Sequence, residues 1–172
     1  MRVTVARLSA AEAETRLEEL VDILVDVVDG GASVSFLRPL GRDEALAFWR
    51  GAIEAVEADR RVLLLAADGA GPIGTVQLDL PWYPNQRHRA DAMKLLVHRR
   101  ARRLGAGRML MLALEDEVRR LGRSLITLDT VTGGPAERLY LSLGYKPAGV
   151  IPRFALSSDG RLEDTSVMYK EL

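Results

Sequence analysis

Residues 90–121 read ADAMKLLVHRRARRLGAGRMLMLALEDEVRRL, and the rest of the chain can be placed relative to this stretch. Its apolar beginning predicts a strand over residues 90–97, and an arginine-rich turn ending in glycines follows over residues 98–107. Apolar residues then recur at helical spacing, which predicts a helix. They are Leu110, Met111, Leu114, Val118 and Leu121.

A strand, a glycine turn and a helix in this order favour a site for an anion. The first N–H groups of a helix have no partner within the helix, and the helix dipole places partial positive charge there. Glycines let backbone N–H groups approach a ligand closely. A phosphorylated ligand suits this chemistry, and a solvated basic turn is the alternative. The cationic side chains of the turn are Arg99, Arg100, Arg102, Arg103 and Arg108.

Composition excludes several classes of protein. A length of 172 residues fits one domain, 1–172, and the 24 basic residues balance the 24 acidic ones, so no overall field favours nucleic acid. Without cysteine there is no disulfide or thiolate site, and two histidines are too few for a His-based metal site, so no metal is expected. No apolar run has the length of a membrane span. We therefore expect a cytoplasmic protein without membrane or nucleic-acid partners.

The order of predicted elements indicates an α/β (α+β) fold with one mixed, mostly antiparallel central sheet of about seven strands, flanked by about four helices. After a strand over residues 2–8, Ser9 and Glu12 form a capping-box pattern that begins a helix ending at Gly30-Gly31. The other expected elements are helices over residues 42–57 and 136–143, and strands over residues 61–67, 73–80, 124–130, 146–156 and 161–170.

Two motifs together point to one family. Residues 102–107, RRLGAG, fit R/Q-x-x-G-x-G/A directly after the strand that ends at Val97, and residues 136–145, AERLYLSLGY, fit A-x-x-L-Y-x-x-L-G-Y/F. This pair, with one strand between, resembles the GNAT acetyltransferase superfamily. Arg99 stands where the family often has proline, and Arg103 where it often has glycine. Gly133 stands at a position often held by asparagine, so a side-chain hydrogen bond to the cofactor is lost or replaced.

The resemblance implies the GNAT acyltransferase fold, acetyl-CoA as cofactor and acetyl transfer to an amine. Backbone N–H groups of the predicted strand would polarise the thioester carbonyl and align the pantetheine arm, and the turn would hold the pyrophosphate. The residues of the strand are Leu95, Leu96 and Val97; those of the turn are Arg102, Arg103, Leu104, Gly105, Ala106, Gly107 and Arg108.

Two side chains are candidates for the chemistry. Tyr140, with an unperturbed pKa near ~10, stays protonated at neutral pH and can donate to the departing sulfur, or it is simply a packed tyrosine. Asp129 can accept the ammonium proton or bind the positive charge of the acceptor, or it caps residues 132–134. The C-terminal half also resembles the tabtoxin-resistance-type N-acetyltransferases. That resemblance implies a small-molecule amine acceptor, which we expect to be an antibiotic-, toxin- or amino-acid-like compound. It also supports Asp129 and Tyr140 as the catalytic pair and makes Gln77 a substrate contact.

The loop over residues 81–89, with its two prolines, contains the aromatic residues Trp82 and Tyr83. They are expected either to contact the substrate or to pack on the sheet edge. Two other functions remain open: a protein N-terminal acetyltransferase, and an acyl-CoA-binding module without turnover. The family resemblance is compatible with a homodimer.

Overall fold

In the computed structural model of the protein, which describes residues 3–172, seven strands form one sheet in the order β1-β2-β3-β4-β5-β7-β6. Only β4 and β5 pair in parallel, and every other neighbouring pair is antiparallel. The mixed, mostly antiparallel sheet predicted from the sequence is therefore confirmed. The strands are β1 (Thr4–Leu8), β2 (Arg61–Asp68), β3 (Gly71–Asp79), β4 (Arg89–Val97), β5 (Leu125–Val131), β6 (Lys146–Leu156) and β7 (Leu162–Glu171).

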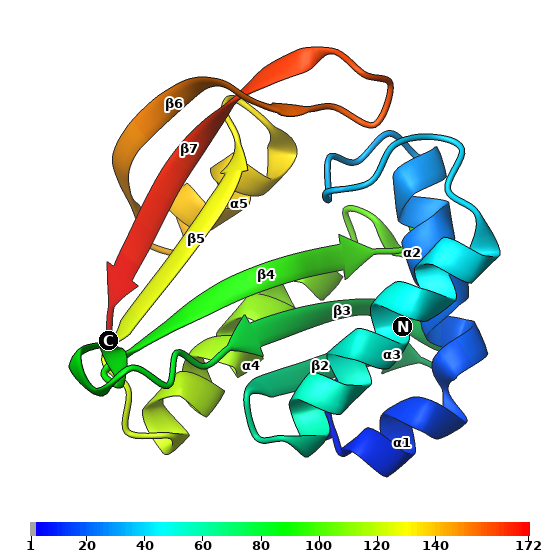
Figure 1. Ribbon diagram of the computed structural model, residues 1–172, viewed down its shortest axis with the longest axis horizontal. Coiled ribbons are helices and arrows are strands. Elements are labelled where there is room, and N and C mark those ends of the chain that lie inside the picture. The colour runs from blue at the N-terminus through cyan, green and yellow to red at the C-terminus, as the bar shows by residue number, and fades with distance from the viewer. Residues whose placement is uncertain (1–2) are drawn as a thin grey trace.

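Helices cover both faces of the sheet (Figure 1). Residue 2, in the strand expected over residues 2–8, lies outside the described residues. The helices are α1 (Ala10–Thr15), α2 (Leu17–Asp29), α3 (Arg42–Glu57), α4 (Ala106–Arg120) and α5 (Pro135–Ser142), with two short 3-10 helices, η1 (Pro84–Gln86) and η2 (Arg99–Ala101).

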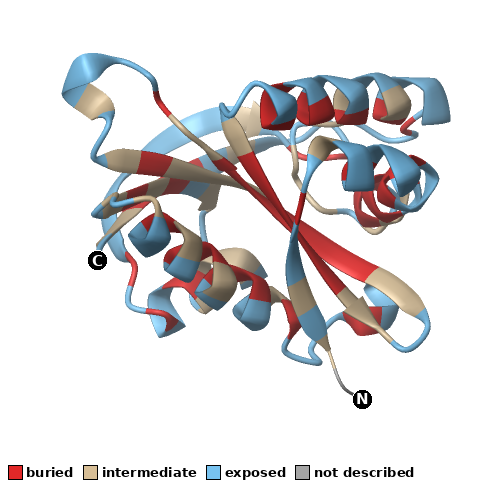
Figure 2. Ribbon diagram, turned by 90° about the horizontal axis from the view of Figure 1, so that it is seen from below, coloured by how far each residue is buried: buried red, intermediate tan, exposed pale blue. Residues whose placement is uncertain are grey.

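Each helical layer buries its own apolar core against the sheet. Leu24 of α2 and Trp49 of α3 pack with Leu63 of β2 on one face. On the other face, Leu110 of α4 packs with Val76 of β3 in the second core. Figure 2 shows buried residues along the strands and on the helix faces turned toward them. Side chains alternate between the two faces of β2 and β3, so each face of these strands packs against a different helical layer.

The first predicted helix is two helices in the structure. Its capping box is present: the Ser9 side chain accepts from the Glu12 backbone N–H, and the Glu12 carboxylate accepts from the Ser9 N–H. The helix ends after six residues because Thr15 Oγ1 donates to the Glu12 carbonyl and Arg16 adopts φ −110° and ψ 14°. Local side-chain hydrogen bonding of this kind competes with a continuing helix.

Strands β4 and β5 pair only at their beginnings. Arg89–Asp91 align with Leu125–Thr127, and residues 92–97 of β4 have no strand partner on that side. Figure 1 shows the two strands diverging, with α5 beside β5, α4 behind β3 and β4, and the α2–α3 loop beyond the wide end of the opening. Backbone N–H and C=O groups of β4 therefore face an opening in the middle of the sheet.

Candidate active site

The turn before α4 presents unpaired backbone donors to the opening. Gly105 is the N-cap of α4 with φ +86°, which a residue with a Cβ rarely adopts, and no side chain caps the helix. The first turn of α4 contains no acidic residue. A Cβ at Gly107 would lie 3.3 Å from Leu139 Cδ2, so a side chain would fill the space between α4 and α5. These features fit a bound phosphate group.

The arginines of this turn divide into two groups. Arg99 Nε donates to Asp26 over 2.8 Å, and Arg100 donates to Asp68 over 2.8 Å. The hydrogen bond from Arg100, together with the Ala70 backbone N–H, lowers the pKa of the Asp68 carboxyl. Tertiary contacts therefore pair Arg99 and Arg100 with acids that lie far away in the sequence. These two arginines stabilise the fold.

The other three arginines form no ion pair with residues 3–172, so their charges are available to a ligand. Arg102 and Arg103 are exposed, and Arg103 has φ 63°. Arg108, in the first turn of α4, donates to Ser142 Oγ of α5 over 3.3 Å. The three arginines predicted to hold pyrophosphate are thus the ones that the fold leaves without a carboxylate, while Leu104 between them is exposed.

The strand residues expected to contact the cofactor, Leu95, Leu96 and Val97, face the opening mainly with their backbone. The Leu96 side chain is buried in the core under α2 and α3, whereas Leu95 and Val97 pack against the core under α4. On the β5 side these residues lie beyond the pairing with that strand, which stops at Asp91. These three residues can therefore contact a ligand through their main-chain N–H groups.

Tyr140 lies on α5 with its side chain buried, and its ring centroid is 5.7 Å from that of Tyr145. Burial, and then the negative charge of Asp129, raise the pKa of the Tyr140 phenol well above its ordinary value. The Tyr140 hydroxyl therefore keeps its proton at neutral pH.

Asp129 is exposed on β5, on the face opposite the buried Ile126 and Leu128. Its negative charge raises the pKa of Tyr140 on α5 and opposes the lowering of the Lys94 pKa on β4. It does not cap residues 132–134, because the Gly133 N–H donates to Glu137 Oε2 over 2.6 Å.

Gln77 lies on β3 and is fully buried. Its Oε1 accepts from Arg61 Nη1 over 3.1 Å, and Arg61 is in turn paired with Asp79 at 3.1 Å. The Gln77 Nε2 group has no hydrogen-bond partner in the described part of the chain. A buried amide that is held at one end and unpaired at the other is positioned to bind a ligand.

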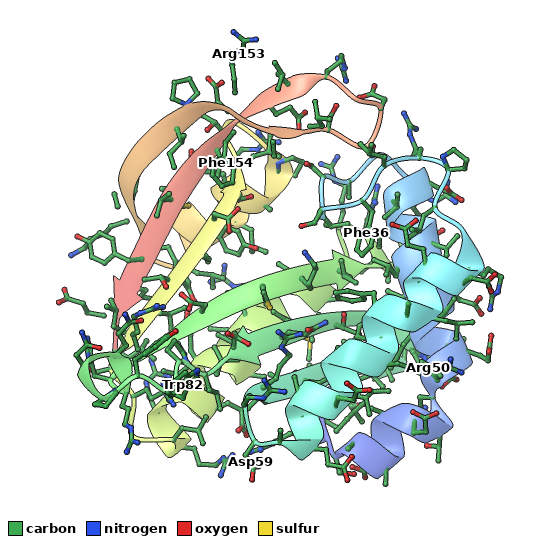
Figure 3. The ribbon with its side chains drawn as sticks, in the orientation of Figure 1. Phe36, Arg50, Asp59, Trp82, Arg153 and Phe154 are labelled. Atoms are coloured by element: carbon green, nitrogen blue, oxygen red, sulfur yellow. The ribbon has the colours of Figure 1, made fainter. Side chains whose placement is uncertain are left out.

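Trp82 and Tyr83 are 66% and 51% exposed and stack on each other with centroids 4.4 Å apart. They border a cavity of about 280 Å³ near the beginning of β4, together with Arg61, Asp79 and Asp91. Figure 3 shows Trp82 at this end of the sheet and Phe36 on the α2–α3 loop, away from it. The two aromatic residues therefore lie at the outer end of the sheet face that carries Gln77.

Two residues that sequence reasoning did not single out contribute to this face. Lys94 interrupts the apolar strand predicted over residues 90–97, and this interruption was the available signal. Its Nζ lies 2.8 Å from Ser35 Oγ and 6.0 Å from the centre of the Phe36 ring. Glu163 of β7 has a buried Oε2 without a partner among residues 3–172, and nothing in the sequence marks it.

Residues 3–172 contain neither a metal site nor a membrane-spanning helix. No group of His, Asp and Glu side chains is arranged to hold a metal ion. Likewise, no helix combines the length and the apolar character that crossing a bilayer requires.

Comparison with known proteins assigns the fold and the family. A sequence profile described as "Acetyltransferase (GNAT) family" matches residues 31–145. The solved structure of yncA from Salmonella typhimurium with its cofactor acetyl-CoA is 22% identical, with a TM-score of 0.79, covering 100% of this chain and 95% of that one.

Two further solved structures have the same fold. The ribosomal-protein-alanine N-acetyltransferase of Brucella melitensis is 21% identical, with a TM-score of 0.81 over 98% of this chain and 99% of that one. A candidate phosphinothricin N-acetyltransferase is 18% identical, with a TM-score of 0.80 over 99% of both chains. With the profile match covering most of the sequence, the chain belongs to the acetyltransferase (GNAT) family of acyltransferases, whose acyl donor is acetyl-CoA.

Proposed function

We propose that the protein is an acetyl-CoA-dependent N-acetyltransferase that acetylates the amine of a small molecule by direct attack in a ternary complex. The observation that carries the proposal is the position of Asp129 and Tyr140. Asp129 extends from β5, and Tyr140 lies on α5, close enough for the Asp129 charge to raise the Tyr140 pKa. Asp129 lies beyond Thr127, the last residue of β5 that pairs with β4, which supports a place for it beside the opening between β4 and β5.

The residues present fit acetyl-CoA. The uncapped first turn of α4 with Arg102, Arg103 and Arg108 would bind its pyrophosphate, and Gly107 lets this turn pack closely against α5 and β4. Backbone groups of Leu95, Leu96 and Val97 would align its pantetheine arm and polarise the carbonyl.

Acetyl-CoA supplies the activated acetyl thioester when bound. Asp129 binds the ammonium of the acceptor and takes a proton from it, directly or through water, which frees the nitrogen lone pair. Tyr140 O–H would donate its proton to the sulfur as the C–S bond breaks and the new C–N bond forms, and the second proton that the acceptor nitrogen loses would return to the Tyr140 oxygen. Because its pKa is raised, Tyr140 holds its own proton until sulfur develops charge.

A small acceptor is favoured by the contacts that close the face opposite α4 and α5. The Arg38 backbone N–H donates to the Ser158 carbonyl over 2.7 Å, and the Arg38 guanidinium lies 3.8 Å from Asp159. These contacts connect the α2–α3 loop to the β6–β7 hairpin, and Figure 1 shows the two segments meeting beyond the wide end of the opening. An extended peptide, as a protein N-terminal acetyltransferase requires, would have to separate them.

Calorimetric titration with acetyl-CoA tests the cofactor assignment, with dephosphorylated pantetheine as the control ligand. We expect acetyl-CoA to bind with an affinity that depends on the pyrophosphate. An amine panel and a peptide panel, assayed for release of coenzyme A, then separate the two acceptor classes. Binding without turnover on either panel would favour the acyl-CoA-binding module, and no binding at millimolar acetyl-CoA would refute the proposal.

We further propose a cytoplasmic homodimer. The location follows from the use of acetyl-CoA, which is an intracellular metabolite. The dimer is supported by β6, an edge strand with exposed apolar side chains, because long apolar edges favour association. Sedimentation of the purified protein measures its mass in solution. The exposed residues are Val150, Ile151, Phe154 and Leu156.

A further inference from the structure

A bulge in β4 places Lys94 on the acceptor side of the sheet. Thr75 of β3 pairs with Leu96, and Gln77 pairs with Met93, so Lys94 and Leu95 together oppose one residue of β3. Lys94 has φ 51°, a conformation that a residue with a side chain adopts only where the surroundings impose it. In a regular strand, Lys94 would point to the face opposite Met93.

The contacts of Lys94 show which face it occupies. Its Nζ lies 5.9 Å from the Phe48 ring centre, in α3, and donates to Ser35 Oγ in the α2–α3 loop. Gln77 lies on this face as well, since its partner in β2 is Leu63, which packs under α2 and α3. The bulge therefore brings an ammonium group to the strand face that already carries an unpaired amide.

The ammonium of Lys94 lacks a counter-ion. It is half-buried, and no carboxylate in residues 3–172 forms an ion pair with it. Burial lowers its pKa, the charge of Asp129 acts in the opposite direction, and Arg61 adds to the lowering. A desolvated cation with no partner is costly, and a bound anion would provide the missing partner.

Gln77 adds a fixed hydrogen-bond donor to this cation. Because its Oε1 accepts from Arg61, the amide is oriented with Nε2 as its free end, and that atom is buried without a partner. Thr75 Oγ1, two residues away on the same face of β3, is also buried and unpaired. Buried donors that are left unpaired by the protein are normally satisfied by a ligand or by water.

The strands on the other side of the opening carry acids. Asp129 lies on β5 and is paired in register with Val167 of β7. Glu163 lies on the same face of β7 as Val167, because the two are four residues apart in one strand. The acceptor side of the opening therefore has the Lys94 ammonium on β4 and the Gln77 amide on β3, and it has carboxylates on β5 and β7.

We propose that Lys94 and Gln77 form a subsite for an anionic group of the acceptor, so that the acceptor is a zwitterion of the amino-acid type. Its carboxylate, or a comparable acidic group, binds Lys94 Nζ and Gln77 Nε2, while its amine lies toward Asp129. This assignment rests on the proposed acetyl transfer for its amine, but the anion subsite can be measured by binding alone. The positive charge of Lys94 would repel a polyamine that has no acidic group.

The test compares matched acceptors: a set of amino acids, their carboxamides and the corresponding decarboxylated amines. Binding is measured by calorimetry in the presence of coenzyme A, and transfer by release of coenzyme A from acetyl-CoA. We expect the wild-type protein to prefer the acids, and Lys94→Met to weaken their binding by roughly 10- to 100-fold with little effect on the carboxamides. Lys94→Arg should retain part of the preference.

Arg50→Met serves as the control, because Arg50 is an exposed cation on the outer side of α3 (Figure 3). An acid preference that Lys94→Met abolishes, without acetyl transfer, would support the subsite and refute the proposed reaction. The subsite is refuted if no panel compound binds, if carboxamides bind as well as acids, or if Lys94→Met weakens both equally. Unchanged acetyl-CoA affinity in Lys94→Met shows that the cofactor site is intact.

Discussion

The ammonium group of Lys170 lies 2.7 Å from the carbonyl oxygen of Leu143, the residue that ends α5. The same Nζ also donates to both carboxylate oxygens of Glu115 on α4, over 2.7 and 2.8 Å. A cation at the last carbonyls of a helix is favourable. Lys170 on β7 thus fixes the short helix that carries Tyr140 to α4 and to the sheet.

Replacing Lys170 should therefore affect both stability and turnover. Lys170→Met leaves the buried Glu115 carboxylate without its closest partner, and we expect the free energy of unfolding to fall by about 3 kcal/mol. Turnover should fall while acetyl-CoA affinity is kept, because Tyr140 is displaced and the α4 turn is not. Urea denaturation and steady-state kinetics measure the two effects. Lys170→Arg is the conservative control, and wild-type stability in Lys170→Met would contradict this view.

Tyr140→Phe should separate turnover from binding. Without the phenol no acid protonates the sulfur, so kcat should fall by roughly two orders of magnitude or more. The ring remains in place, so acetyl-CoA affinity should stay close to that of the wild type. Calorimetry and steady-state kinetics on one preparation provide both values. Equal losses in the two quantities would reject Tyr140 as the acid.

Alkaline pH should destabilise the protein through its buried tyrosines. Burial and the charge of Glu115 raise the pKa of Tyr145, and burial raises that of Tyr140. In the unfolded chain both phenols ionise near pH ~10, whereas in the folded protein they keep their protons, so stability is lost as pH rises above that value.

Tyr145→Phe should flatten this dependence. The Tyr145 hydroxyl is buried and has no hydrogen-bond partner of good geometry among residues 3–172, so its removal should change stability at pH 7 by no more than about 1 kcal/mol. Thermal unfolding between pH 8 and 11, as a chosen range, measures the slope for both proteins. An identical slope in the variant would show that Tyr145 does not titrate in this way.

Gly107→Leu should weaken acetyl-CoA binding. The new side chain would start 3.3 Å from Leu139 Cδ2 and 3.6 Å from Val97 Cγ2, where α4, α5 and β4 meet. Gly51→Leu in α3 is the matched control, since nothing lies within 4 Å of a Cβ there. Affinity measured by calorimetry should fall only in the first variant, and equal affinities would place the cofactor elsewhere.

Arg100 and Arg103 should behave differently although they lie three residues apart. Arg103→Ala should weaken acetyl-CoA binding most at low salt, because its charge has no carboxylate partner in the described chain. Arg100→Ala should instead lower stability, since Arg100 pairs with Asp68. The Asp68 pKa is lowered in the folded protein, so this stabilisation is present above the ordinary carboxyl pKa near ~4 and is lost as pH falls below it.

Comparing the two variants by calorimetry and by denaturation at neutral and acidic pH checks both statements. If Arg100→Ala weakened the cofactor as much as Arg103→Ala, the division of the arginines would be wrong. If the stability deficit of Arg100→Ala persisted unchanged at pH 3, a chosen value below the carboxyl pKa, its origin would lie outside the Asp68 pair.

Local patterns were enough to predict the strands and the longer helices in their order, although the first predicted helix divides into α1 and α2. Helical and alternating periodicity reports which side chains can share one face, and this depends only on the geometry of a single segment. The capping box at Ser9 and the glycine turn at Gly105 are local signals for the same reason. The two motifs, each within ten residues, then identified the family.

The tertiary structure decided how distant residues meet. Periodicity cannot show that Asp26 and Asp68 neutralise Arg99 and Arg100, because these partners lie 73 and 32 residues away in the chain. The β4 bulge, which places Lys94 on the sheet face that carries Gln77, likewise depends on register with β3 rather than on the composition of the strand. The sequence by itself determined the sheet, the helices and the turn before α4. Only folding determined which charges remain unpaired, since that depends on contacts between segments far apart in the sequence.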